Sequence, residues 1–155
     1  MKIYRWLGSL VVLVVMLLIF SLSAQPAVES RSLSGPLVVR LKAKVEASKL
    51  IPKDMKEAFF KAPSFWVRKL AHVSIYFLLG FVLYLALPTR RWGMGKSFLL
   101  AVGICAVYAL GDEWHQLFVL GRSAELRDII LDSMGALGGI LLGWLIKKVA
   151  SFKMK

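Results

Sequence analysis

Four runs of mostly apolar residues, each long enough to cross a lipid bilayer as a helix, constrain the fold of this chain most strongly. A transmembrane helix needs about 20 predominantly apolar residues. The four runs are Trp6–Ser23, Leu70–Leu87, Ser97–Phe118 and Ile129–Ile146. Composition supports the same class, because 58% of the 155 residues are hydrophobic and the mean hydropathy is +0.68. We therefore expect an all-α membrane protein, with four transmembrane helices in one domain over residues 1–155.

The charged residues lie mostly beside these runs. The chain has 21 Lys and Arg against 9 Asp and Glu, a formal net charge of +12. Such an excess favours nucleic-acid binding in a soluble protein, but beside membrane spans basic residues contact anionic headgroups. The N-terminus, residues 90–96 and the C-terminal tail hold nine Lys and Arg and no acid. The positive-inside rule predicts that both termini are cytoplasmic and that residues 25–68 are extracytoplasmic, although residues 25–69 oppose this with ten Lys and Arg.

The first run also resembles a secretory signal peptide. Lys2 and Arg5 precede it, and the small residues Ser21–Ala24 follow. Its apolar part is longer than a usual signal sequence and three further spans follow, so we expect an uncleaved first helix. The single Cys105 excludes an intrachain disulfide.

The polar stretch between the first two spans predicts two short helices. We expect a loop from Pro26 to Pro36. Leu37–Lys49 then carries Leu and Val at i, i+4 and i+8 among basic residues, which predicts an amphipathic helix in the headgroup layer that ends at Pro52. A second helix is expected over Lys53–Lys61, ended by Pro63.

The conspicuous polar residues gather at one end of the expected bundle. The second span begins, the third ends and the fourth begins on the same side, so their polar ends share one depth. A carboxylate near the centre of a membrane helix costs roughly 2.5–3.5 kcal/mol, which favours a functional role for those retained here. The predicted binding residues are Lys69, His72, Asp112, Glu113, Gln116, Arg122, Asp128 and Asp132, with Asp112, Glu113 and His72 as candidates for catalysis.

Several residues near these candidates are interpreted as structural and not as part of the site. His115 lies off the line of Asp112 and Gln116 on the helix, and Tyr76 is interpreted as a packing or interface residue. Gly135, Gly139 and Gly143 repeat the G-x-x-x-G spacing that favours close helix packing in membranes.

In their order, these residues match a known family. Arg68-Lys69-x-x-His72-x-x-x-Tyr76, Asp112-Glu113-x-x-Gln116-x-Phe118, Gly121-Arg122, Asp128 and Gly135 resemble the VanZ-like family of bacterial membrane proteins. That family is named for a protein associated with low-level resistance to the glycopeptide teicoplanin. Phe20-Ser21-Leu22-Ser23-Ala24-Gln25-Pro26 resembles the end of the family's first helix. The resemblance covers about Trp6 to Gly143 and implies a four-helix protein of the bacterial cytoplasmic membrane. Two positions depart from the family, with Leu120 where proline is common and Asp132 where asparagine is common.

These observations favour two functions. One is an accessory or binding factor of the cell envelope that contributes to teicoplanin-type resistance or to envelope homeostasis, with a lipid-linked precursor or a glycopeptide as partner. The alternative is a membrane enzyme that acts on a lipid-linked or headgroup substrate by carboxylate and histidine acid–base chemistry. Ion transport is disfavoured, because the cytoplasmic halves of the spans hold almost no ionisable groups. The spacing identifies no metal site or cofactor, although clustered carboxylates leave a divalent cation such as Mg²⁺ open.

Overall fold

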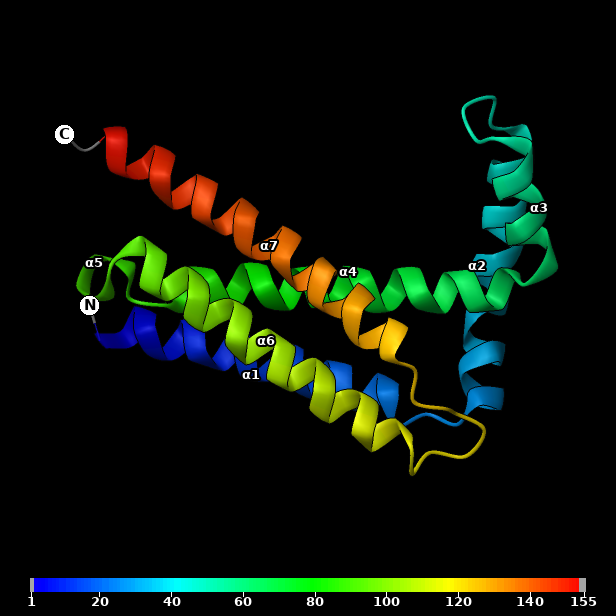
Figure 1. The fold of residues 1–155 in the computed structure, drawn as a ribbon, viewed down its shortest axis with the longest axis horizontal. Helices are drawn as coiled ribbons and strands as arrows, with labels where there is room; N and C mark the ends of the chain where they lie inside the picture. Colours follow the sequence, from blue (N-terminus) through cyan, green and yellow to red (C-terminus); the bar gives the residue numbers. More distant parts are fainter. Residues whose placement is uncertain (1, 154–155) are drawn as a thin grey trace.

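The chain folds into four long helices with a shorter helical arm at one end (Figure 1). The computed structural model describes residues 2–153, without the side chains of residues 2–5, 31, 33, 34 and 153. The helices are α1 (Lys2–Ser23), α2 (Ala27–Ala47), α3 (Lys53–Lys61), α4 (Pro63–Ala86), α5 (Thr89–Trp92), α6 (Met94–Gln116) and α7 (Leu126–Lys153). Helices α1, α4, α6 and α7 are long and apolar enough to span a membrane. The predicted all-α membrane fold is confirmed.

The observed spans extend beyond the predicted ones at several ends. Helix α4 starts at Pro63, seven residues before Leu70. Proline favours the first position of a helix, where its missing N–H leaves no bond unmade. Pro63 therefore begins α4 as well as ending α3, and Ala62 alone separates the two helices.

The predicted loop from Pro26 to Pro36 is wrong. Helix α2 begins directly after Pro26 and continues through Pro36 to Ala47. Pro36 is exposed and removes only one backbone donor, whereas packing buries Ala27 and Val38. Tertiary contacts of this kind outweigh weak local propensity in a helix. The predicted apolar stripe is also shifted, because Val38 is buried and Leu37 is half exposed.

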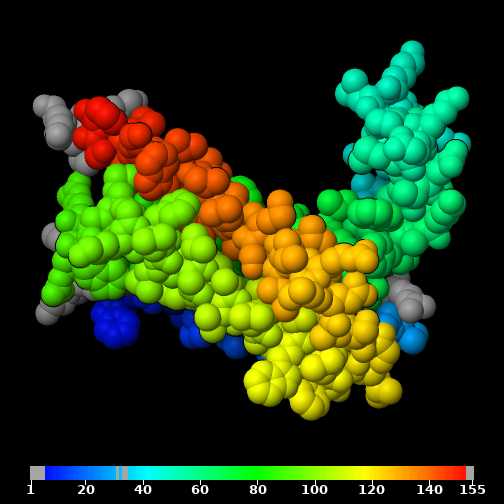
Figure 2. All heavy atoms as spheres, in the orientation of Figure 1, coloured from blue at the N-terminus to red at the C-terminus, as the bar shows by residue number. Residues whose placement is uncertain are grey.

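Helix α3 occupies Lys53–Lys61, as predicted, with Pro52 as its N-cap. Helices α2 and α3 lie across the end of the bundle and stand away from its body (Figures 1 and 2). We call this pair the α2–α3 arm (Ala27–Lys61). Its direction is the one that a helix pair in a headgroup layer would take beside upright spans.

Helices α4 and α7 form the tightest contact in the bundle. A Cβ on Gly135 would lie 2.5 Å from the carbonyl oxygen of Val73. A Cβ on Gly139 would overlap the backbone of Phe77. Only glycine allows two helix backbones to approach this closely. The close packing predicted from the G-x-x-x-G spacing is therefore confirmed.

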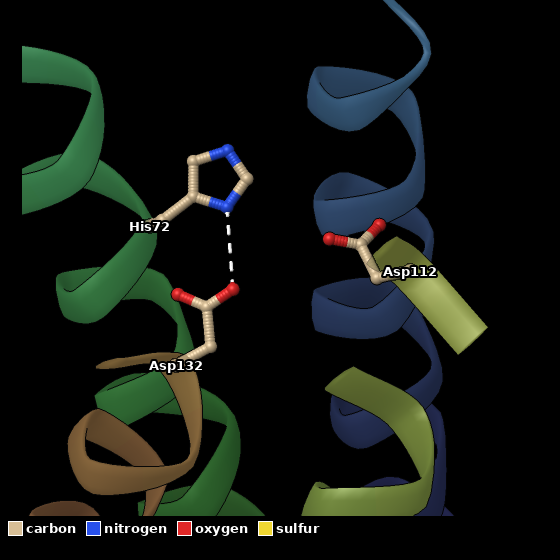
Figure 3. A group of neighbouring side chains, drawn as sticks. All are labelled: His72, Asp112 and Asp132. Atoms are coloured by element: carbon tan, nitrogen blue, oxygen red, sulfur yellow. Dashed lines mark ion pairs between the residues drawn. The ribbon is translucent and has the colours of Figure 1, made fainter. Parts of the chain in front are cut away.

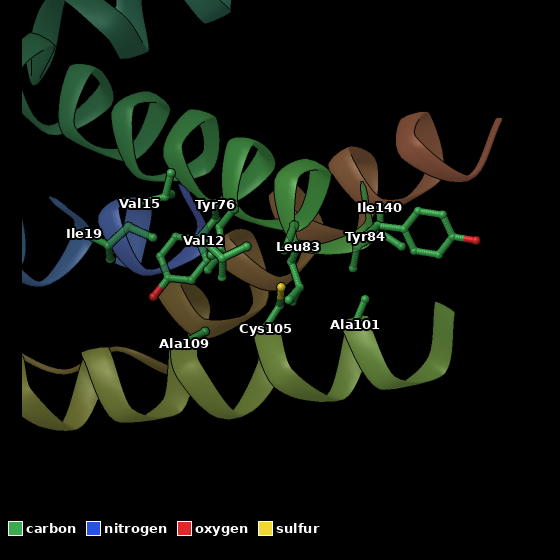
Figure 4. Packing of buried hydrophobic residues seen from close by; sticks show 12 residues of the cluster. Val12, Val15, Ile19, Tyr76, Leu83, Tyr84, Ala101, Cys105, Ala109 and Ile140 are labelled. Carbon is green, nitrogen blue, oxygen red and sulfur yellow. The ribbon is translucent and has the colours of Figure 1, made fainter. Parts of the chain in front are cut away.

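The interior is small and the apolar surface is large. Tyr76, Cys105 and Ile140 lie in one buried cluster with residues of all four long helices (Figure 4). Many large apolar side chains, such as Leu10 and Val107, remain exposed on the outside. A soluble protein rarely exposes apolar surface on this scale, whereas a bilayer would cover it.

The two ends of the bundle differ in chemistry. The start of α1, helix α5 and the end of α7 lie together at one end (Figure 1). The other end holds the α2–α3 arm and the segment of residues 117–125 that joins α6 to α7. The predicted alternation of span direction is confirmed, and every candidate polar residue falls at the arm end.

Candidate functional site

Three polar side chains from three helices converge inside the arm end of the bundle. His72 of α4 lies beside Asp132 of α7, with 3.6 Å between Nδ1 and Oδ2. Asp112 of α6 faces this pair (Figure 3), and one ligand atom from each residue lies within 4.8 Å of the others. The side chains of Asp112 and Asp132 are both buried. Two unit negative charges at this separation repel by about 3 kcal/mol at an effective dielectric constant of about 20, so the group needs a proton or a cation to balance it.

Helix α1 contributes to the site through Ser23. Its fully buried hydroxyl donates a hydrogen bond of 2.9 Å to Oδ2 of Asp112, and Nε2 of Gln116 donates to the same oxygen at 3.2 Å. The other oxygen, Oδ1, is buried without a hydrogen-bond partner. The carboxylate is thus fixed on one side and unsatisfied on the other.

Arg122 joins the segment between α6 and α7 to the end of α1. Its Nε donates to the carbonyl of Gln25 at 3.0 Å and its Nη2 to that of Leu22 at 3.1 Å. Its Nη1 donates to Oε1 of Gln116 at 3.1 Å. Burial lowers the pKa of the Arg122 guanidinium, and the nearby charge of Arg68 lowers that pKa further. A guanidinium nevertheless stays charged in proteins, so Arg122 brings a fixed positive charge to the site.

Lys69 forms a separate ion-pair group at the mouth of the site. Its Nζ pairs with Asp128 and lies 3.8 Å from Oε2 of Glu125. The ammonium also lies 5.0 Å from the centre of the Phe65 ring. The positive charge of Lys69 is therefore balanced locally, and this residue does not contact Asp112.

Glu113 holds the chain that enters α7. Its Oε1 accepts a hydrogen bond of 2.6 Å from the backbone N–H of Glu125. His115, two residues later on α6, stacks on Phe20 of α1 with ring centres 4.4 Å apart. These contacts give Glu113 and His115 structural partners away from the convergent group of His72, Asp112 and Asp132.

Two hollows of different character lie beside the convergent group. A polar pocket of about 120 Å³ opens at the arm end. A much larger apolar groove of about 690 Å³ runs between α1 and α6. The pocket is lined by Arg68, Lys69, His72, Arg122 and Asp132 among others, and the groove by Phe20, Gly103, Val107, Asp112 and His115 among others.

A family model described as VanZ/LLP1 matches residues 9–147, nearly the whole chain. The chain belongs to the VanZ/LLP1 family. The matched range runs from α1 into the last turns of α7 and includes all eight predicted binding residues. With its four membrane-length helices, the chain is a multi-pass membrane protein of VanZ type. Searches of curated proteins and of solved structures gave no match.

The candidate site contains two residues to which the sequence analysis assigned no role, Ser23 and Glu125. Ser23 is one of several small polar residues near the end of the first span, and nothing in its spacing pointed to Asp112. Glu125, which supplies its amide to Glu113 and its carboxylate to Lys69, was also missed. The available signal for Ser23 was the family-like run Phe20–Pro26. All eight predicted residues do lie at one end: Gln116 links the groups around Asp112 and Arg122, and Lys69 forms a separate group with Asp128 and Glu125.

Proposed function

We propose that this VanZ/LLP1-family protein is a binding factor of the bacterial cell envelope that holds an anionic lipid or a lipid-linked envelope precursor. The observation that carries the proposal is that two unlike hollows open beside the last turns of α6. Gln116 lines the polar pocket, while Asp112 and His115 line the apolar groove. A ligand that fills both needs a polar head and a long apolar tail.

The charges of the polar pocket favour an anionic head. Lys69 is balanced by Asp128 and Glu125. Arg68 and Arg122 also line the pocket, and within the described side chains neither forms an ion pair with a carboxylate. Nε of Arg68 is buried without a hydrogen-bond partner. Two such guanidinium groups match a phosphate group, which they bind through charge-assisted hydrogen bonds.

The size of the polar pocket distinguishes between the two expected partners, a lipid-linked precursor and a glycopeptide. At about 120 Å³, it is smaller than the roughly 300–1,000 Å³ of pockets that enclose a drug-sized ligand. A phosphate-sized group fits, and a whole glycopeptide does not. We therefore attribute a contribution to teicoplanin-type resistance or envelope homeostasis to capture of the lipid and not of the antibiotic.

A groove-filling variant tests this function. Gly103 lines the groove, and a Cβ there would meet no atom within 4 Å. Gly103→Leu therefore extends a side chain into the groove from an unobstructed Cβ position, and we expect the purified protein to lose most of its bound lipid, measured by mass spectrometry. Gly95→Leu is the matched control, because Gly95 is equally unobstructed on α6 but outside the groove. Equal lipid content in both variants would contradict the proposal.

The proposal also places the arm end outside the cytoplasm. Arg90, Arg91, Lys96, Lys147 and Lys148 lie toward the opposite end, which the positive-inside rule assigns to the cytoplasm. Ser123 is exposed in the segment between α6 and α7, whereas Cys105 is buried. We expect an impermeant maleimide to label Ser123→Cys in intact cells. Labelling only after lysis would reverse the orientation.

The second candidate function is that of an enzyme, and one observation favours it. His72 and Asp132 form a pair opposite the unsatisfied oxygen of Asp112, an arrangement suited to acid–base chemistry on a bound headgroup. The test compares the lipid-precursor pools of cells that express the wild type or His72→Gln at equal protein level. A product that depends on His72 would favour the enzyme, and unchanged pools would favour the binding factor.

A further inference from the structure

The ligand atoms of His72, Asp112 and Asp132 have the separations of a metal site that needs little rearrangement to close. One imidazole nitrogen and two carboxylate oxygens lie within 4.8 Å of one another. Metal–ligand bonds of about 2.0–2.2 Å place the ligands of one ion at most roughly 4.4 Å apart. Small side-chain rotations therefore bring all three residues onto a common ion. The three residues come from α4, α6 and α7, so the helix packing brings them together.

A second observation points to a ligand between these side chains. Asp112 is 5% exposed, and its Oδ1 has no hydrogen-bond partner. Ser23 and Gln116 hold the other oxygen, and the carboxylate faces the His72–Asp132 pair (Figure 3). The fully buried Tyr76 also lies close to Asp112. Buried polar atoms without partners are rare and call for an explanation such as an ion or a water.

We propose that His72, Asp112 and Asp132 bind one divalent transition-metal ion, Zn²⁺ or Mn²⁺. An imidazole with two carboxylates suits these ions, whereas Mg²⁺ and Ca²⁺ favour sites made of oxygen ligands alone. A divalent cation also balances the two carboxylates. His72 and Asp132 line the polar pocket, so the ion reaches the site from the arm end and keeps positions open for water.

Ser23 acts in this site as a positioning residue. Its hydroxyl fixes Oδ2 of Asp112 and so directs Oδ1 toward the ion. Partners that orient a metal ligand in this way typically contribute 10–100-fold to metal affinity. Ser23→Ala should therefore weaken metal binding by about this factor and leave one ion per chain.

The experiment uses the full chain, purified in detergent without a histidine tag and stripped with a chelator. Zn²⁺, Mn²⁺ and Mg²⁺ are titrated separately, and bound metal and the thermal unfolding midpoint are measured. We expect one Zn²⁺ or Mn²⁺ per chain with a higher midpoint, and no effect of Mg²⁺ at equal concentration. Co²⁺ should give visible absorption bands that saturate at one equivalent.

Matched variants locate the ion. Asp112→Asn and His72→Gln should each weaken binding at least about tenfold, as loss of a direct ligand requires at minimum. Asp128→Asn is the control, because Asp128 pairs with Lys69 outside the convergent group, and its binding should match the wild type. Unchanged binding in both ligand variants would overturn the proposal. The proposal would also be overturned if the wild-type protein showed no saturable binding of Zn²⁺ or Mn²⁺, or if it bound Mg²⁺ in preference to them.

The proposal does not depend on the bound lipid. Gly103→Leu is expected to change the lipid content from a position nine residues before the metal ligand Asp112 on α6. Metal binding that persists in Gly103→Leu would support a site independent of the lipid. Loss of metal binding there, in a folded protein, would contradict that independence.

Discussion

Gly135→Ala should separate α4 from α7 at the point where the site is built. A Cβ at Gly135 would lie 2.5 Å from the carbonyl oxygen of Val73, and real Cβ atoms essentially never approach below 3.0 Å. The two backbones must therefore move apart by at least about half an ångström. Overpacking of this kind costs about 1–3 kcal/mol. Backbone atoms on both sides leave little room for relief.

The matched control is Gly103→Ala, where a Cβ meets no atom within 4 Å. Both substitutions lie inside helices and gain the same helix propensity, about 1 kcal/mol in favour of alanine. That gain cancels in the comparison, so the free energy of unfolding of Gly135→Ala should be lower than that of Gly103→Ala by about 1–3 kcal/mol. The assay is unfolding in mixed detergent micelles with increasing dodecyl sulfate, followed by circular dichroism. Equal stability of the two variants would refute the close-contact argument.

Gly135→Ala should also change the surroundings of the His72 imidazole and leave those of His115 unchanged. His72 directly precedes Val73, and Asp132 lies one turn before Gly135. Separation of α4 and α7 therefore widens the distance of 3.6 Å between Nδ1 of His72 and Oδ2 of Asp132. His115 stacks on Phe20 between other helices. Nuclear magnetic resonance of ¹⁵N-labelled histidine should show a changed imidazole for His72 only. A change confined to His115 would contradict this coupling.

Three further substitutions test individual contacts. Ser23→Ala removes the donor to the buried carboxylate on α6 and should lower the free energy of unfolding by about 1–3 kcal/mol, whereas Ser21→Ala, at an exposed position bonded within its own helix, should change it little. Glu113→Gln keeps an acceptor for the loop amide, so limited proteolysis between α6 and α7 should accelerate in Glu113→Leu and not in Glu113→Gln. Lys147→Met removes two hydrogen bonds to carbonyls at the end of α4 and should lower the unfolding midpoint more than Lys148→Met on the exposed side.

The location of the site could be predicted from the sequence because it follows from span direction alone. Four apolar runs fix which helix ends share a side of the membrane, and this placed Lys69, His72 and Asp132 together before any contact was known. The pairing could not be predicted. Which acid meets which cation depends on helix rotation, and a rotation of one residue exchanges the roles of Asp112 and Glu113.

The contribution of α1 and the start of α2 needed the folded molecule. Ser23 is fully buried because α1 packs on α4 and α6, a contact that hydropathy does not encode. Pro26 and Pro36 favour a loop locally. Ala27 is nevertheless buried, and its backbone N–H donates a hydrogen bond to the carbonyl of Leu120. In both cases long-range contacts decide the outcome, and a single sequence gives no direct signal for them.

The junction of the α2–α3 arm with α4 fixes the position of the polar pocket relative to the arm. Ala62 is the one residue between α3 and α4, and the indole N–H of Trp66 donates to the carbonyl of Ala58 across the joint. A bilayer that holds the arm at its surface therefore holds His72 at a fixed depth below that surface. A change in bilayer thickness would then be taken up at the opposite end, around Arg90 and Lys96, and the pocket would keep its exposure to water in thin and thick membranes alike.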